Sequence, residues 1–289
     1  MTSLRLRLGR LRAFLWRFHT LPLAHRLFDG TAGPRVLKRP FCGFDLHVDV
    51  SRSNPQQLLY LEGERFVPER TLLRGLLRSG MRAVDVGANI GYYLLLLESA
   101  VGAGGSVACF EPEPENLREL ERNIRANRLE NVQVFAAAVG AEDSRISMRT
   151  GINAAVAGTG EGEFTAPLTR LDSALTSPVD FVKIDVEGYE GHVLEGARRI
   201  LRDDQPALFV EIHPGFLSAP YTVDQILGLL AEHYASVRLF EISPQAGFLE
   251  KLKARYLRQA VRPVPDREAL LASCRAGRRE EPFWAVCTP

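Results

Sequence analysis

The chain of 289 residues is poor in lysine and cysteine, and it lacks any long apolar run. Only four of its 36 basic residues are Lys, so Arg carries almost all of the positive charge. The four Cys residues show no metal-like pairing, which indicates a reduced, cytoplasmic protein. No window approaches eighteen consecutive apolar residues, which excludes a membrane-spanning helix. Apolar residues still make up 46% of the chain, enough for the sizeable core of a globular enzyme.

Charge is unevenly distributed, although the formal net charge is only +1. Residues 1–40 carry nine basic residues and one acid, and residues 251–280 carry nine basic residues and three acids. The stretch between them, 41–250, carries eighteen basic residues and thirty acids. The basic ends are either solvated faces or regions that attract anionic lipid, phosphate or an acidic acceptor.

The chain is predicted to divide into an N-terminal segment, 1–40, and one larger domain, 41–289. Apolar residues between 4 and 18 recur at helical spacing with arginines on the other faces, and 20–40 is rich in Gly and Pro, as linkers are. The basic amphipathic helix could make a peripheral contact with an anionic membrane, or pack on the domain or on a second subunit of a homo-oligomer. The N-terminal arginines are not followed by a clean apolar segment or a small-residue cleavage site, so we expect no signal peptide.

Strand and helix patterns alternate through most of the larger domain. Strands are predicted over 41–50, 81–86, 105–110, 132–139, 180–185, 207–212, 236–242 and 283–288, and helices over 67–79, 90–101, 114–127, 190–202 and 223–234. Residues 141–170 favour short antiparallel strands and loops. This alternation predicts an α/β fold with a doubly wound, mostly parallel sheet. The last strand follows a basic insertion at about 243–281 without a clear crossover helix, which favours an antiparallel strand.

A glycine-rich turn between a strand and a helix is the strongest functional signal. It runs from Asp85 to Gly91, and Glu111 ends the next predicted strand twenty residues later. Such a turn lets a ligand approach the backbone, and a strand-end carboxylate can accept the hydroxyls of a ribose. A dinucleotide would require glycines where Asn89 and Tyr92 stand. The acid before the turn would oppose a pyrophosphate but suit the ammonium of S-adenosylmethionine (SAM), so SAM is the expected cofactor.

At these motifs the chain resembles the FkbM family of SAM-dependent methyltransferases. The matching stretches are Val84-Asp85-Val86-Gly87-Ala88-Asn89-Ile90-Gly91-Tyr92, Phe110-Glu111-Pro112-Glu113-Pro114-Glu115-Asn116, Ala137-Ala138-Val139-Gly140, Leu171-Asp172, Phe181-Val182-Lys183-Ile184-Asp185-Val186-Glu187-Gly188-Tyr189-Glu190 and Val210-Glu211-Ile212-His213. The resemblance covers about 60–242 and departs at Leu94, where a small hydroxyl residue is common. It implies a Rossmann-like methyltransferase fold that usually methylates oxygen on small molecules or sugars.

The resemblance also implies roles for individual residues. Asp85, Gly87, Asn89 and Gly91 would line the methionine end of SAM, Glu111 would hold the ribose, and Ala138 and Val139 would border the adenine. One of the two tyrosines after the turn is expected at the edge of the cofactor. The full set of expected cofactor contacts is Asp85, Gly87, Asn89, Gly91, Tyr92, Glu111, Pro112, Ala138, Val139 and Asp185.

The expected catalytic residues are Lys183, Asp185, Glu187 and His213. The first three alternate along one extended segment and therefore share a face. Lys183 has either a special role or that of a buried counter-ion for Asp185 or Glu187. His213 follows a strand, and a base, an acceptor or cofactor contact, and a structural role all remain open. Asp185, Glu187 and His213 are also suitable metal ligands, but no spacing signature supports a metal site, and none is assigned.

We expect an O-methyltransferase that acts on a hydroxyl of a small molecule or sugar, with no nucleic-acid partner. Two alternatives stay open: a nucleotide-dependent oxidoreductase on the same sheet, and a protein that binds SAM without turnover. The insertion at 243–281 is expected to cap the acceptor site. Its Arg255, Arg258 and Arg262 would favour an anionic or phosphate-bearing acceptor, although a solvated helix or a subunit contact would also fit.

Overall fold

The computed structural model describes residues 35–52, 56–57, 59–60, 67–150, 155–156, 162–242 and 261–289. The predicted amphipathic helix at 4–18 lies outside the described residues, and so do Arg255 and Arg258 of the basic insertion. Within the described ranges, no helix is long and apolar enough to cross a membrane. All four Cys side chains are free thiols.

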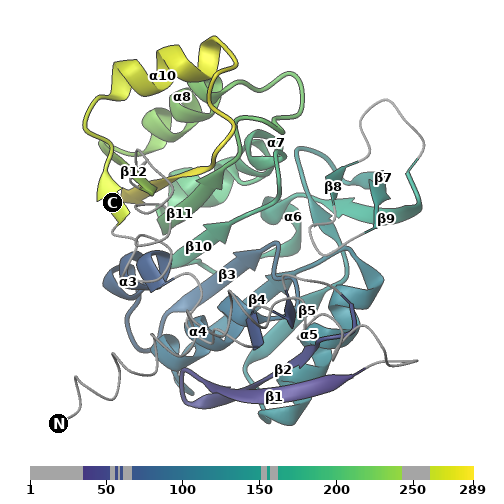
Figure 1. Ribbon diagram of the computed structural model, residues 1–289. Coiled ribbons are helices and arrows are strands. Elements are labelled where there is room, and N and C mark those ends of the chain that lie inside the picture. Colours follow the sequence, from purple (N-terminus) through teal and green to yellow (C-terminus); the bar gives the residue numbers. More distant parts are fainter. Residues whose placement is uncertain are drawn as a thin grey trace, which may run out of the picture.

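A mixed eight-stranded sheet forms the centre of the protein (Figure 1). In order across the sheet its strands are β13 (Val261–Pro263), β12 (Ser236–Ile242), β14 (Phe283–Thr288), β11 (Ala207–Ile212), β10 (Phe181–Ile184), β3 (Arg82–Val86), β4 (Ser106–Phe110) and β5 (Val132–Phe135). The five strands from β11 to β5 are parallel. Strand β14 is antiparallel to both of its neighbours, β11 and β12. The predicted mostly parallel sheet with an antiparallel last strand is confirmed.

Helices cover both faces of this sheet. They are α3 (Val67–Leu76), α4 (Tyr92–Val101), α5 (Pro114–Ala126), α6 (Leu171–Ala174), α7 (Glu190–Glu195), a π-helical turn η1 (Ile200–Asp204), α8 (Val223–His233) and α10 (Arg267–Arg275). Alternating side chains of one strand enter two separate cores. Val182 and Ile184 join the core that contains α7 and α8, whereas Phe181 joins the core that contains α3 and α4. The sheet is therefore wound on both faces, as the sequence predicts.

The predicted strand over 132–139 is in fact two strands in different sheets. Strand β5 ends at Phe135, and the N–H of Ala137 donates to the carbonyl of Phe135 at 2.9 Å, which closes a three-residue turn. Strand β6 (Ala138–Val139) then joins a second sheet with β7 (Ser144–Arg149), β8 (Ala155–Val156) and β9 (Phe164–Thr169), in the order β6-β9-β7-β8. Because of this bend, residues 137–139 do not continue the edge strand β5 but lie near the carboxyl ends of the central strands.

The predicted helix over 190–202 is also interrupted. Helix α7 ends at Glu195, and η1 begins at Ile200. Between them, Gly196 approaches the chain so closely that an added Cβ would lie 1.9 Å from the carbonyl oxygen of Gly140. This contact packs the interrupted helix against the loop between β6 and β7 of the second sheet.

The predicted linker at 20–40 is wrong from Val36 onward, where a strand begins. Strand β1 (Val36–Phe41) pairs with β2 (Phe44–Asp49) in an antiparallel hairpin. Side chains at the C-terminal end of α5 bind the backbone of β2: Asn123 Oδ1 accepts from the N–H of His47 at 2.7 Å, and Oδ1 of Asn127, which caps the helix, accepts from the N–H of Asp45 at 2.8 Å. The hairpin therefore belongs to the same folded unit as the sheet.

The described part of the basic insertion extends the sheet. Strand β13 pairs with β12, and α10 packs against α8. Arg262 forms an ion pair with Glu241 at 3.0 Å. Arg279 pairs with the same carboxylate at 2.9 Å, and the Arg262 side chain stays 44% exposed. The role expected of Arg262 in binding an anionic acceptor stays a prediction.

Candidate active site

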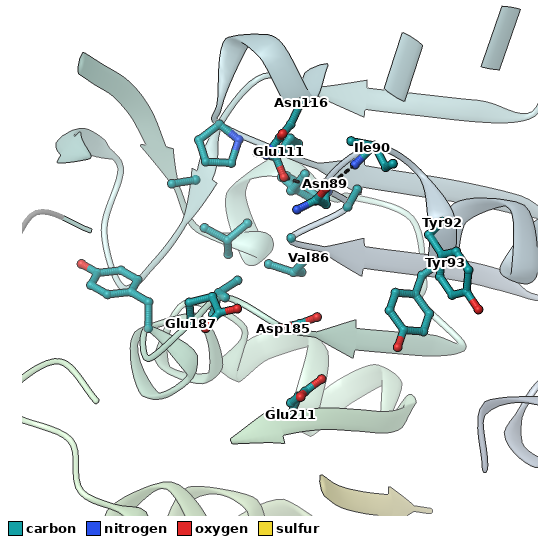
Figure 2. A pocket seen from close by; sticks show the side chains of 18 of the residues that line it. Val86, Asn89, Ile90, Tyr92, Tyr93, Glu111, Asn116, Asp185, Glu187 and Glu211 are labelled. Atoms are coloured by element: carbon teal, nitrogen blue, oxygen red, sulfur yellow. Dashed lines mark hydrogen bonds between the residues drawn. The ribbon is translucent and has the colours of Figure 1, made fainter. Parts of the chain in front are cut away.

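A cavity of about 440 Å³ lies at the carboxyl ends of β3, β4, β10 and β11 (Figure 2). This volume is typical of small-molecule sites, and this sheet edge is where open α/β sheets bind ligands. The predicted site residues that line it are Gly87, Asn89, Tyr92, Glu111, Pro112, Ala138, Val139, Asp185, Glu187 and His213. Three others, Asp85, Gly91 and Lys183, lie outside the lining.

The glycine-rich turn brings the backbone of β3 against the end of β10. Gly87 has a φ of +81°, and an added Cβ would lie 1.9 Å from the carbonyl oxygen of Asp185. Only glycine satisfies both constraints. Asn89 also has a positive φ, of 51°, and its Oδ1 accepts from the N–H of Ile90 at 2.8 Å. The turn thus forms a narrow cavity wall made largely of backbone.

Glu111 is buried at the end of β4 and faces the cavity (Figure 2). Its Oε2 accepts from the N–H of Asn89 at 2.8 Å, and its Oε1 accepts from the N–H of Glu113 at 2.9 Å and from Asn116 Nδ2 at 3.3 Å. Burial raises the pKa of Glu111 to about 7 despite these donors. A carboxylate has about four acceptor positions, so about one remains for a ligand hydroxyl. A second ligand hydroxyl would displace the long contact from Asn116.

Small apolar residues form another wall of the same cavity. Pro112 follows Glu111, and residues 137–139, which the bend after β5 places here, are all alanine or valine. Side chains of this size leave room for a flat ring beside the carboxylate. An apolar slot with one carboxylate at its edge suits a nucleoside.

The structure places Asp85 and Lys183 beneath the cavity. The register of β3 and β10 pairs these residues, so their side chains meet on one face of the sheet, with Lys183 Nζ 3.0 Å from Asp85 Oδ1. Both are almost fully buried. Burial raises the pKa of Asp85, and the charge of Lys183 opposes this rise. Asp85 therefore faces Lys183 and does not line the cavity, so its position does not support the expected direct contact with a cofactor ammonium.

Lys183 also reaches Asp185, whose Oδ2 lies 3.6 Å from its Nζ. Its ammonium lies 4.5 Å from the centre of the Tyr93 ring. These contacts correspond to the buried counter-ion that the sequence left open for Asp185, with Asp85 as the nearer partner.

Gly91 and Tyr92 have mainly packing contacts. Gly91 precedes α4 with a φ of +93°, and an added Cβ would lie 3.0 Å from Leu120. Tyr92 lines the cavity but is buried, with its ring centre 4.3 Å from that of Phe41. Tyr92 therefore packs against the β1–β2 hairpin, and Tyr93 lines the same cavity.

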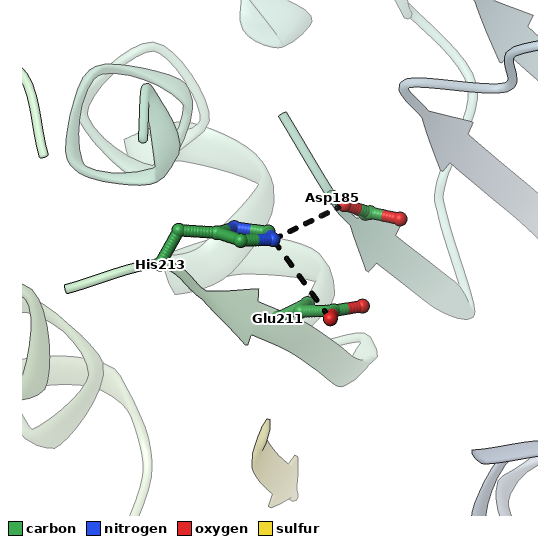
Figure 3. Close-up of side chains that lie close together, drawn as sticks. All are labelled: Asp185, Glu211 and His213. Carbon is green, nitrogen blue, oxygen red and sulfur yellow. Dashed lines mark ion pairs between the residues drawn. The ribbon is translucent and has the colours of Figure 1, made fainter. Parts of the chain in front are cut away.

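A cluster of carboxylates surrounds His213 at the ends of β10 and β11 (Figure 3). Its Nε2 lies 3.9 Å from Asp185 Oδ1, 3.8 Å from Glu211 Oε1 and 3.6 Å from Glu187 Oε2. On the other side of the ring, Nδ1 lies 2.8 Å from Glu190 Oε1. The cavity thus has a strongly acidic end, opposite in character to its apolar wall.

The carboxylates change the proton affinity of this cluster. Burial alone would lower the pKa of His213, but the hydrogen bond to Glu190 and the nearby carboxylates raise it to about 9. Burial and the charge of Asp185 raise the pKa of Glu211 to about 8. The raised pKa means that His213 keeps its proton to a higher pH than an ordinary imidazole, which disfavours its action as a simple imidazole base.

Comparison with known proteins identifies the family. The family model described as "Methyltransferase FkbM domain" matches residues 85–267, which is more than half of the chain. The chain belongs to the FkbM methyltransferase family. No curated protein matches it.

Several solved structures resemble this FkbM methyltransferase at low identity. The FkbM methyltransferase from Methylobacillus flagellatus is 16% identical with a TM-score of 0.45, over 94% of this chain and 60% of that one. An rRNA methylase from Streptococcus thermophilus is 13% identical with a TM-score of 0.43, over 76% and 93%. Aeropyrum pernix fibrillarin with bound S-adenosyl-L-methionine is 15% identical with a TM-score of 0.41, over 90% and 86%.

Three residues of this FkbM methyltransferase site were missed as site residues from the sequence. Glu211 lies two positions before His213, so strand alternation could have placed both on one face. Glu190 opens α7 and orients His213, whereas Asn116 supports Glu111 from α5. Both residues lie within the stretches that resemble the family, but the contacts themselves could not be foreseen, because each joins segments whose relative position only the fold determines.

Proposed function

We propose that the protein is a SAM-dependent methyltransferase that methylates a hydroxyl oxygen of a small molecule. The observation that carries this proposal is one cavity with two unlike ends: an apolar slot beside Glu111, and the acidic cluster around His213. A nucleoside suits the first end, and a polar acceptor suits the second. The family supports methyl transfer, and the cavity supports SAM and the acceptor.

The residues present fit SAM. Glu111 keeps an acceptor position for a ribose hydroxyl, and its raised pKa reflects a carboxylate that protein donors stabilise only in part. Ala138 and Val139 would border the adenine, and the turn at Gly87 would lie along the methionine part. Asp185, at the junction of the two ends, would attract a cationic group.

Bound in this cavity, SAM supplies a methyl group that its positively charged sulfur makes electrophilic. The chain's residues hold the acceptor: Glu187, which lines the cavity beside His213, can accept a hydrogen bond from its hydroxyl and receive the proton that oxygen loses. Tyr92, which is buried, and Tyr93, which is partly buried against the same core, border the cavity and limit the entry of water. Positioning of the two reactants in line is the main contribution expected of such a site.

Calorimetry with SAM, NAD and NADP tests the cofactor. We expect SAM to bind, NAD and NADP not to bind, and Glu111→Ala to weaken SAM binding at least about tenfold through loss of a charged hydrogen bond. A folded Glu111→Ala variant that binds SAM like the parent would disprove this assignment. Binding of NAD instead would favour an oxidoreductase.

Transfer of labelled methyl groups from SAM into a set of hydroxylated and amine acceptors tests the reaction. We expect product from hydroxyl compounds. SAM binding without transfer to any acceptor in such a set would favour a non-catalytic SAM-binding protein, and exclusive transfer to amines would refute the oxygen specificity.

A further inference from the structure

Three side chains at the acidic end of the cavity converge on one point. The register that pairs Ile184 with Val210 brings the next residues, Asp185 and Glu211, level with each other on adjacent strands. His213 follows two residues later on the same face. One oxygen of each carboxylate and one ring nitrogen of His213 all lie within 4.8 Å of one another (Figure 3).

The imidazole is oriented toward this point. Glu190 is fully buried, and its Oε1 accepts a hydrogen bond from Nδ1–H of His213 at 2.8 Å. The same oxygen accepts from the N–H of Gly188 at 2.9 Å, which holds the carboxylate in place. Nε2 is left to face the cavity, although the His213 side chain is only 7% exposed. A carboxylate behind a histidine is the usual support of a metal-binding imidazole.

The distances from His213 to the two carboxylates are longer than those of a close ion pair. A charged imidazole that paired with these carboxylates would approach them to about 2.7–2.9 Å. Instead, Nε2 lies 3.8 Å from Glu211 and 3.9 Å from Asp185, which are long ion pairs and not hydrogen bonds, and Glu187, at 3.6 Å, is also beyond hydrogen-bond distance. Donors about 2.0–2.2 Å from a shared cation are separated by about 3 Å when adjacent and about 4.2 Å when opposite. The distances from Nε2 of His213 to Asp185 and to Glu211 fall in that range.

We infer that Asp185, Glu211 and His213 bind a divalent cation that holds the methyl acceptor through two neighbouring oxygens. Two carboxylates and one imidazole suit Mn²⁺ better than Mg²⁺, which prefers oxygen alone. Three protein ligands leave positions open toward the cavity, where a vicinal diol or a hydroxy acid can bind. This assignment of an acceptor class rests on the proposed function, whereas the metal site itself does not.

Titration of the chelator-treated full chain with Mn²⁺, followed by electron paramagnetic resonance of the free ion, tests the site. We expect one bound ion per chain. Asp185→Asn, Glu211→Gln and His213→Gln preserve size, and each should weaken binding by more than about 100-fold. Glu190→Gln, which changes only the support of His213, should weaken it by about 10–100-fold. Circular dichroism verifies that each variant folds.

The matched control is Glu111→Gln at the opposite end of the cavity, which should bind Mn²⁺ like the parent. A parent that binds SAM in calorimetry but no Mn²⁺ overturns the metal site and leaves the proposed function intact. Mn²⁺ binding that is lost in the three ligand variants, without SAM binding, supports the metal site and refutes the proposed function. Mn²⁺ binding that all three substitutions leave unchanged also overturns the inference. With Mn²⁺ bound, methyl transfer should favour vicinal diols over isolated hydroxyls, and equal rates would refute the acceptor class.

Discussion

Glu111 links pH, stability and cofactor binding in one residue. Its carboxyl is buried, and its pKa in the folded protein is about 7, compared with an ordinary 4.5. This difference corresponds to roughly 3 kcal/mol. Between these pH values the folded chain holds a proton that the unfolded chain has released. Stability therefore falls as pH rises from 4.5 to 7, and above pH 7 the full penalty of an ionised, buried carboxylate remains.

Denaturation by urea at a series of pH values measures this penalty. The parent should lose about 3 kcal/mol relative to Glu111→Gln between pH 4.5 and pH 8, because the glutamine does not titrate. Comparison of the two proteins cancels the titration of other groups. Lost hydrogen bonds in the variant add an offset that does not change with pH. Parallel stability curves for the two proteins would refute the assigned pKa.

The same ionisation should control SAM affinity. If the ionised carboxylate accepts a ribose hydroxyl, SAM binding by the parent should weaken by up to about tenfold for each pH unit below 7. Binding by Glu111→Gln should be weaker at pH 8 and should lack the loss of affinity that protonation of Glu111 causes near pH 7. Isothermal titration calorimetry from pH 5.5 to 8 measures both. A parent whose affinity does not change over this range would show that Glu111 does not bind the cofactor through its charged form.

Three further predictions concern the framework of the site. Gly87→Ala should destabilise the fold by at least about 2 kcal/mol and weaken SAM binding, because the added Cβ would collide with the carbonyl of Asp185 and the backbone φ is positive. The control is Gly75→Ala, which has open space around its Cβ and should leave the thermal unfolding temperature almost unchanged. Asp85→Asn should lower the free energy of unfolding by about 3–5 kcal/mol, because Lys183 would be buried without its nearest opposite charge. In urea denaturation, the double variant Asp85→Leu with Lys183→Met should recover much of this loss. Equal losses in the two variants would contradict the pairing. Asn123→Ala should cost about 2–4 kcal/mol, because Asn123 bonds to both backbone groups of His47 and to the carbonyl of Ile90. Hydrogen exchange at the amide of His47 should then accelerate, and unchanged protection there would rule out this anchoring role.

Local patterns in the sequence determine most of the fold. The alternation of apolar strands and helices predicts the order of the main elements, and the bounds of β11 and β12 agree at both ends. The turn at Gly87 and the acid at Glu111 are also readable, since each depends on a few neighbouring residues and on its place at a strand end. The bends could not be predicted from local patterns. The turn at Ala137 and the interruption at Gly196 depend on contacts with residues far away in the sequence.

Tertiary structure decides which polar side chains meet. Asp85 and Lys183 are 98 positions apart, and only the register of β3 and β10 pairs them and removes Asp85 from the cavity. The acidic cluster likewise combines residues of β10, β11 and α7, whose spacing in sequence carries no signature. The physical reason is that short-range preferences set the elements, whereas register and packing between elements set the distances of a few ångströms on which ion pairing and catalysis depend.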